Sequence, residues 1–196
     1  MQQAKAEQTV ETVSDSRLML AVGGGDTSAF RLLVERHHGL VFRIAWRMLN
    51  DASEAEDVAQ ECFTRLWTQA PGWSPQGGGL GGWLRRVATN ACLDRIRKHR
   101  RLSDEPVPDM TDDAPLPDAQ VDSARQRDAV AAAVQALPDR QRAAIVLTYY
   151  EDMSNAEAAA TLDMHLKAFE SLLLRARAAL RSALLPAHAG TAGGAP

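Results

Sequence analysis

A stretch near the middle of the chain, 103-SDEPVPDMTDDAPLPDAQVD-122, sets the strongest limit on what this sequence can fold into. It holds four prolines, many carboxylates and few large apolar residues. A segment of this composition buries too little apolar surface to offset the entropy lost on ordering, so it predicts a flexible linker. We therefore expect two helical domains, at 16–101 and 123–185, with an acidic linker over 102–122.

The rest of the 196-residue chain narrows the possible classes of protein. The polar ends, 1–15 and 186–196, are predicted to be disordered. No apolar run approaches the roughly 18 residues of a membrane span, and the N-terminus lacks the apolar segment of a secretion signal. We therefore expect a cytoplasmic protein without membrane insertion. Cys62 and Cys92 lie inside helical patterns without metal-ligand spacing, which favours buried, reduced thiols.

Apolar residues recur at spacings of three and four on both sides of the linker, and no segment alternates as a strand would. This pattern predicts an all-α protein of two small helical domains. In the first domain we expect helices at 15–23, 26–50, 54–69 and 83–101. In the second we expect helices at 124–136, 139–150 and 166–185, and a short helix that begins after Ser154. The helix at 54–69 is expected to bury Val58, Cys62, Phe63, Leu66 and Trp67.

Local signals predict how several of these helices begin and join. Ser53 with Glu56, and Ser154 with Glu157, have the spacing of capping boxes. The glycines of 77-GGGLGG-82 predict the end of a pliable loop over 71–82. The last two helices, joined by a tight turn, have the helix-turn-helix pattern. Asp163 occupies the turn position that usually requires glycine, and aspartate tolerates a left-handed conformation better than most residues.

The helix at 83–101 combines a packing face with a basic face. Residues 85–101 hold seven Arg and Lys residues against Asp94 alone, whereas 102–122 holds seven carboxylates and no Lys or Arg. At 100° per residue, Trp83, Val87 and Ala91 share one side and are predicted to pack. The adjacent face carries Arg86, Asn90, Arg97 and Arg101. A helix C-terminus favours two or three cations through its dipole, so seven favour contact with a nucleic acid.

The helix at 54–69 carries an acidic face. Glu54, Asp57 and Glu61 recur at spacings of three and four, with Gln60 beside them. From the charges alone, this face is either an ordinary solvated surface or a docking surface for a basic partner. Neither metal binding nor carboxylate catalysis is favoured, because no histidine is near in the sequence. The adjacent histidines His37 and His38 are expected to be polar surface rather than a metal site.

Four segments, in order and at normal spacing, resemble bacterial sigma factors of the extracytoplasmic-function (ECF) group in the sigma-70 family. They are EAEDVAQECFTRLW, WLRRVATNACLDRIRKHRR, LPDRQRAAIVLTYYEDMSNAEAAATL and ESLLLRARAAL, and the likeness extends over about 16–185. The resemblance implies a subunit that binds core RNA polymerase, directs it to promoter DNA and helps open the duplex. It also implies control by an anti-sigma factor and no cofactor. Bond formation would belong to the polymerase, so we expect no enzyme activity and no catalytic residue.

The resemblance assigns the acidic face to core polymerase and the basic helix to the minus-10 element. The polymerase-binding residues would be Glu54, Asp57, Gln60 and Glu61. The minus-10 residues would be Trp83, Arg86, Asn90, Asp94, Arg97, Lys98 and Arg101. The Gly-rich loop before the tryptophan would help hold an unstacked base, which favours melting without any bond being cut.

The resemblance assigns the last helix to the minus-35 element, but the sequence departs from the family there. The DNA-binding residues would be His165, Lys167, Glu170, Ser171, Arg175 and Arg177. Glu170 stands where the family usually has Lys, and Leu172 where it has Arg. Leu172 lies on the edge of the predicted buried stripe of Phe169, Leu173, Ala176, Leu180 and Leu184, so core packing is its simplest role. Either the minus-35 sequence is unusual, or this domain contributes less affinity than usual.

These departures leave a second hypothesis open, a sigma mimic that sequesters an anti-sigma factor and binds no promoter. The intact basic helix argues against it, as does a length with no room for the receiver domain that such mimics carry. A stand-alone helix-turn-helix repressor would have no use for the acidic face or the Gly-rich loop.

Overall fold

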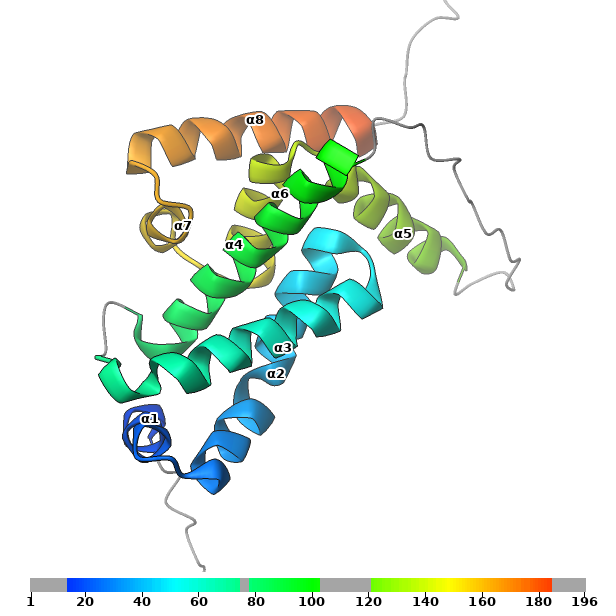
Figure 1. Ribbon diagram of the computed structural model, residues 1–196. Coiled ribbons are helices and arrows are strands. Elements are labelled where there is room, and N and C mark those ends of the chain that lie inside the picture. Colours follow the sequence, from blue (N-terminus) through cyan, green and yellow to red (C-terminus); the bar gives the residue numbers. More distant parts are fainter. Residues whose placement is uncertain (1–13, 75–77, 103–120, 185–196) are drawn as a thin grey trace, which may run out of the picture.

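The computed structural model describes residues 14–74, 78–102 and 121–184, and every regular element within these ranges is a helix (Figure 1). The all-α fold class is therefore confirmed for the described chain. The N-terminal helices are α1 (Asp15–Gly23), α2 (Thr27–Leu49), α3 (Ala52–Gln69), the short 3₁₀ helix η1 (Ala70–Gly72) and α4 (Gly79–Leu102). The C-terminal helices are α5 (Val121–Gln135), α6 (Asp139–Ile145), the π-helical turn η2 (Val146–Tyr150), α7 (Asn155–Thr161) and α8 (Leu166–Leu184).

Helices α1 to α4 form a bundle whose ends are fixed by side-chain caps. The Asp26 carboxylate accepts hydrogen bonds from the backbone N–H groups of Ser28 and Ala29 at 2.8 and 3.0 Å, which starts α2. Asn50 ends α2 in the left-handed conformation, with φ 55°. Asp51 then caps α3 by accepting from the Glu54 N–H at 2.9 Å. The predicted Ser53–Glu56 capping box is wrong, because α3 already begins at Ala52 and its cap is Asp51, two residues before Ser53.

The predicted loop over 71–82 is wrong at its end, because α4 already begins at Gly79. The Gly82 N–H donates to the Gly78 carbonyl at 3.0 Å, and Leu80 is 2% exposed. The buried leucine anchors a helical turn that glycines alone would not favour. Gly78 and Gly79 enter this turn with φ of 86° and 60°, a backbone conformation that other residues rarely adopt.

The core of the bundle differs in two details from the predicted one. Trp67 was expected inside but is 36% exposed, with its ring edge-on to Phe30 at 5.2 Å between centroids. Trp83 and Val87 of α4 are only half-buried, so the inner face of this helix is rotated from the predicted one. The residues of α4 with no exposed surface are Leu84, Ala88, Thr89 and Cys92.

The C-terminal helices form the predicted helix-turn-helix. Ser154 and Glu157 make the reciprocal capping box at the start of α7. Asp163 adopts the left-handed conformation at the turn, with φ 51°. Leu172 is 8% exposed and lies in the core, as expected, whereas Leu184 at the end of the predicted stripe is 40% exposed. The helix expected over 139–150 is α-helical only to Ile145 and continues as η2.

The boundaries of the predicted flexible segments shift slightly. Leu102 belongs to α4, and α5 begins at Val121, so both ends of the predicted linker are helical. Asp15 was expected in a disordered terminus, but it lies in α1 and binds Arg36 and His37. The rest of these segments, at 1–13, 103–120 and 185–196, lies outside the described residues.

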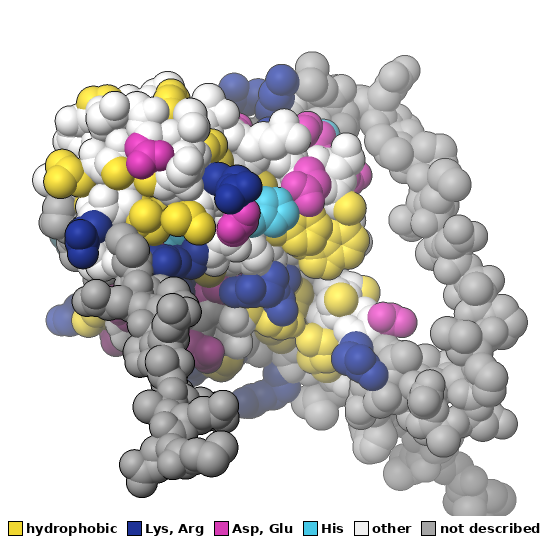
Figure 2. Space-filling view, turned by 90° about the horizontal axis from the view of Figure 1, so that it is seen from below, with side chains coloured by type: hydrophobic (Ala, Val, Ile, Leu, Met, Phe, Trp, Pro, Cys, Tyr) yellow, Lys and Arg dark blue, Asp and Glu magenta, His cyan; other side chains and the backbone are white. Residues whose placement is uncertain are grey.

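The two sets of helices pack against each other in a way that no sequence pattern predicted. In Figure 1, α4 crosses in front of α6 beside α7, and α8 lies across the far end of α6. Buried apolar residues of both sets form one continuous core. From the end of the molecule that carries α1, apolar, positive and negative side chains are interspersed over the visible face (Figure 2), so no single-sign patch dominates it. None of the described helices is long and apolar enough to cross a membrane.

Candidate nucleic-acid interface

The acidic face of α3 is held by a residue that the sequence gave no reason to single out, Arg95 of α4. Its guanidinium lies 2.8 Å from Glu54, 3.5 Å from Glu61 and 4.0 Å from Asp57. Gln60 lies beside them and is exposed. The structure thus brings the three predicted carboxylates together, but it also ties them to the helix that was predicted to bind DNA. No pattern within α3 could have indicated a counter-ion that comes from another helix.

The basic face of α4 is open to solvent along most of its length. The exposed residues among those predicted to bind the minus-10 element are Arg86, Asn90, Asp94, Arg97, Lys98 and Arg101. Asp94 is paired with Arg97 at 2.5 Å, and the Arg97 Nε–H donates to the Leu93 carbonyl at 3.3 Å. These contacts orient the Arg97 side chain along the helix, and the opposite face of α4 is fixed in the core. A rigid row of guanidinium, ammonium and amide groups is suited to a phosphate backbone and to base edges.

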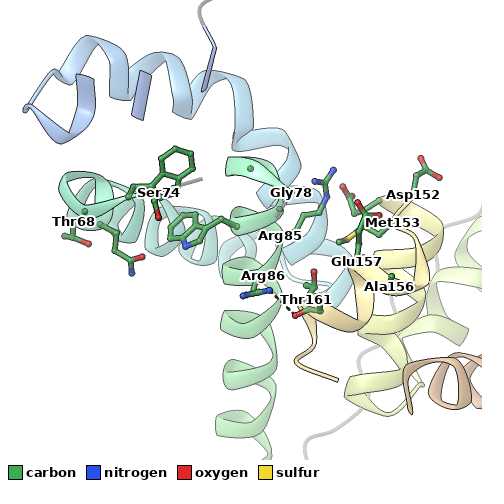
Figure 3. Close-up of a pocket in the computed structure, with 18 residues that line it drawn as sticks. Thr68, Ser74, Gly78, Arg85, Arg86, Asp152, Met153, Ala156, Glu157 and Thr161 are labelled. Atoms are coloured by element: carbon green, nitrogen blue, oxygen red, sulfur yellow. Dashed lines mark hydrogen bonds between the residues drawn. The ribbon is translucent and has the colours of Figure 1, made fainter. Parts of the chain in front are cut away.

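A cavity of about 1080 Å³ lies at the N-terminal end of this row (Figure 3). Trp83 lines it together with Gly78 and Gly82 of the predicted loop region. Its other walls come from the end of α3 and from α7, including Ala156 and Thr161. An aromatic ring beside small residues is the type of surface on which an unstacked base can lie.

Every residue that was predicted to bind the minus-35 element is exposed, on α8 or, for His165, in the turn just before it. The exposed residues are His165, Lys167, Glu170, Ser171, Arg175 and Arg177. The Arg177 guanidinium lies over the Tyr149 ring at 5.4 Å, and the Arg175 Nε–H donates to the Ser171 carbonyl at 3.3 Å. Because Leu172 is buried, its departure from the family pattern affects the core rather than the exposed surface of α8.

Comparison with known proteins gives these surfaces a family. Residues 33–102 match the family described as Sigma-70 region 2, and residues 127–180 match Sigma-70, region 4. The ECF RNA polymerase sigma factor SigW of Bacillus subtilis is 30% identical over 171 residues, which cover 82% of this chain and 91% of SigW. The chain belongs to the ECF group of the sigma-70 family. The resemblance stated from the sequence is thereby confirmed.

Two further relatives show how far the likeness to this sigma factor extends. The ECF RNA polymerase sigma factor SigE of Mycolicibacterium smegmatis is 34% identical over 164 residues, or 82% of this chain and 63% of SigE. The chain thus spans less than two thirds of that relative. A solved structure of CnrH in complex with the cytosolic domain of CnrY matches with a TM-score of 0.62 and 30% identity, over 87% of this chain and 96% of CnrH.

In this sigma factor the region 4 helices contact the basic face of α4, which was predicted to bind DNA. The Arg86 Nη2 donates to the Ala160 carbonyl of α7 at 3.2 Å. Arg100 donates to both carboxylate oxygens of Asp139 in α6, at 2.7 and 2.9 Å. Neither partner could be predicted from the sequence, because the two contacts join residues 74 and 39 positions apart.

A buried carboxylate lies in the same interface. The Glu151 side chain is 2% exposed and lies 3.6 Å from Arg43 of α2. Burial raises the pKa of Glu151, although the nearby cations Arg43, Arg85 and Arg47 partly oppose this shift. One of its oxygens has no hydrogen-bond partner, so region 4 carries a costly charge into the contact.

The cysteines and histidines of the described chain form no reactive centre. Cys62 and Cys92 are both fully buried free thiols, as expected. Burial raises the pKa of Cys62 to about 12 and also raises the pKa of Cys92, so both remain protonated. The histidine pair is not plain surface, because His37 binds Asp15 at 2.7 Å and His38 binds Glu56 at 3.1 Å. Among the described residues, no three His, Cys, Asp or Glu side chains are placed to hold a metal ion.

Proposed function

We propose that this chain is a promoter-specificity subunit. The α3 face around Glu54, Asp57 and Glu61 docks on core RNA polymerase, α4 binds and helps melt the minus-10 element, and α8 reads the minus-35 element. The polymerase supplies the bond-forming chemistry, so the chain itself is no enzyme. This role places it in the cytoplasm, where the polymerase works.

One observation carries the proposal, the exposed basic row of α4 beside the Trp83 cavity. The row is rigid because Leu84 and Cys92 on the opposite side of α4 have no exposed surface. A helix held in this way keeps the spacing of the row when a strand binds, so no backbone ordering opposes binding. The region 2 wall of the cavity, with Trp83, Gly78 and Gly82, adds an aromatic face for a base that has left the duplex stack. A repressor of intact duplex would need the basic row but would have no use for a place that holds an unstacked base.

Promoter binding requires region 4 to move away from region 2. Helix α7 lies against Arg86, which donates to the Ala160 carbonyl, and it forms one wall of the cavity, so it obstructs a strand at this end of the row. We infer that the present arrangement is the state without DNA. An anti-sigma factor would control the chain by binding this closed state, in which the two DNA-binding surfaces cannot act together.

The second hypothesis, a sigma mimic, has lost one of the two observations that favoured it. It rested on Glu170 and Leu172, and the buried Leu172 has a structural role. Glu170 remains, so the experiment must separate binding of polymerase from use of promoters.

The test is run-off transcription with purified core polymerase on a pool of genomic promoter fragments. Asn90→Ala combined with Arg97→Ala removes an amide and a cation from the exposed row without touching the core. We expect specific transcripts with the wild-type chain and their loss with the double variant. Arg31→Ala is the matched control, because its side chain is 76% exposed on α2 and lies outside the proposed surfaces.

The outcomes are distinct. Transcripts that persist in the double variant would show that α4 is not the minus-10 reader. A wild-type chain that binds core polymerase but yields no transcript would instead favour the mimic.

A further inference from the structure

The N-terminal half of α8 exposes a stripe of unusual composition. Leu166, Glu170 and Leu174 recur every four residues, so they follow one line along the helix. Leu166 is 44% exposed and Leu174 is 67% exposed, while Glu170 between them is exposed as well. Leucines on a helix are normally buried, and Phe169 and Leu173 of the same helix are at most 2% exposed. The stripe is therefore a surface without a partner in this arrangement.

The carboxylate in the stripe is also uncommitted. Glu170 makes no salt bridge or side-chain hydrogen bond within the described chain, although it is the only acidic residue of α8. Lys167, one turn earlier, likewise has no side-chain partner there. The other cations of the helix are Arg175, Arg177 and Arg181. Lys167 is the one cation of α8 within three or four residues of Glu170, and the two do not pair, so the carboxylate is available to an external donor.

Duplex DNA is the occupant that the surroundings of this stripe favour. It lies on the second helix of a helix-turn-helix, whose N-terminal residues enter the major groove and contact base edges. The four cations on α8 favour a polyanion as the partner and disfavour a basic protein. Phosphates repel a carboxylate, so Glu170 must point between the two backbones, toward the bases.

We propose that Glu170 and Leu174 set the minus-35 specificity of this chain, with Glu170 reading a cytosine and Leu174 a thymine. A carboxylate can only accept, and the major-groove edge of cytosine offers an N4 amine as donor. A leucine offers no hydrogen bond but packs against the C5-methyl group of thymine. Four residues of helix span about 6 Å, so the two bases lie one or two base pairs apart. This inference rests on the proposed function, which places α8 on the minus-35 element.

The test uses the full chain with core polymerase on promoters with a fixed minus-10 element and a randomised minus-35 element. Barcoded transcripts are counted by sequencing. For the wild type we expect one minus-35 position with a cytosine preference of about fivefold to tenfold. Glu170→Gln should change that preference to adenine, and Glu170→Lys should change it to guanine, because those side chains match those base edges. Leu174→Ser should remove a thymine preference one or two positions away.

Glu35→Gln is the matched control, because this carboxylate is also exposed on a helix surface but lies on α2. It should leave every base preference unchanged. If cytosine stayed preferred in both Glu170 variants, Glu170 would not be the reader and the inference would fail. A wild type without any minus-35 preference would overturn it too, and would assign the exposed leucines to a protein contact. Loss of all promoter-dependent transcripts from the wild type is a different result, since it would refute the proposed function itself.

Discussion

Arg142 of α6 joins the two sets of helices through one of its three hydrogen bonds, and its loss should destabilise the fold. Its Nη1 donates to the Met48 carbonyl at the end of α2, at 2.6 Å. Its Nη2 donates to the Gln135 carbonyl and, at 3.4 Å, to the Leu137 carbonyl. Burial lowers the pKa of this guanidinium, so the three carbonyls must repay its desolvation. Arg142→Met keeps the apolar stem and removes every one of these donors.

The cost follows from the carbonyls that would be left without a partner. Hydrogen bonds from a charged donor contribute about 1.5–3 kcal/mol each, and here two are short and one is long. Methionine buries no charge, so the saved desolvation free energy offsets part of the stability lost with the hydrogen bonds. We therefore expect the free energy of unfolding to fall by about 3 kcal/mol, a large share of the roughly 5–15 kcal/mol of a typical protein. At about 2–4 °C per kcal/mol, Tm should fall by about 6–12 °C.

Thermal unfolding followed by far-UV circular dichroism measures this change. Arg31→Met is the control, because its guanidinium is 76% exposed and its pair with Glu35 at 3.6 Å should contribute less than about 1 kcal/mol. Arg142→Lys should lie between the two, since one ammonium cannot reach three carbonyls. If Arg142→Met unfolded within about 2 °C of the wild type, these hydrogen bonds would not stabilise the fold and the reasoning would be refuted.

Two other predictions concern buried ionisable groups. Because the pKa of Glu151 is raised in the folded chain, the folded state binds this proton more tightly than the unfolded state, and stability should fall as pH rises from about 4 toward neutral. Glu151→Gln should flatten this fall, which urea titrations at several pH values would detect; an equal slope in both proteins would contradict it. Cys62 and Cys92 should react with iodoacetamide at least about a hundredfold more slowly in the folded than in the urea-unfolded chain, because both are buried and protonated. Rapid alkylation of the native protein, measured by mass spectrometry, would count against this.

The sequence was most informative where a structure depends on neighbours along the chain. The Ser154–Glu157 capping box and the left-handed turn at Asp163 are both present, because each is set by residues within one helical turn. The helical periodicity of the sequence also predicted that Leu172 packs in the core, and it is buried. The Asp51 cap was missed because two acceptors, Asp51 and Ser53, compete within three residues, and the spacing rule alone favoured the wrong one.

Long-range partners were beyond the reach of such rules. The link between Arg95 and the acidic face joins residues up to 41 positions apart, and it depends on how α3 and α4 cross. The helical start at Gly79 was missed for a similar reason, since the low helix propensity of glycine is overridden by burial of Leu80. Local preference decides a residue only when no tertiary contact opposes it.

The contacts that close region 4 onto region 2 differ in how DNA would affect them. A phosphate is a stronger partner for Arg86 than the neutral Ala160 carbonyl, so DNA can displace this contact directly. The pair of the exposed Arg100 with the half-buried Asp139 is weakened by salt. The hydrogen bond from Arg142 to Met48 and the shared apolar core gain nothing from a nucleic acid, so their loss must be offset by another partner. In the proposed function that partner is core polymerase, and its binding should therefore precede, and permit, tight binding of the promoter.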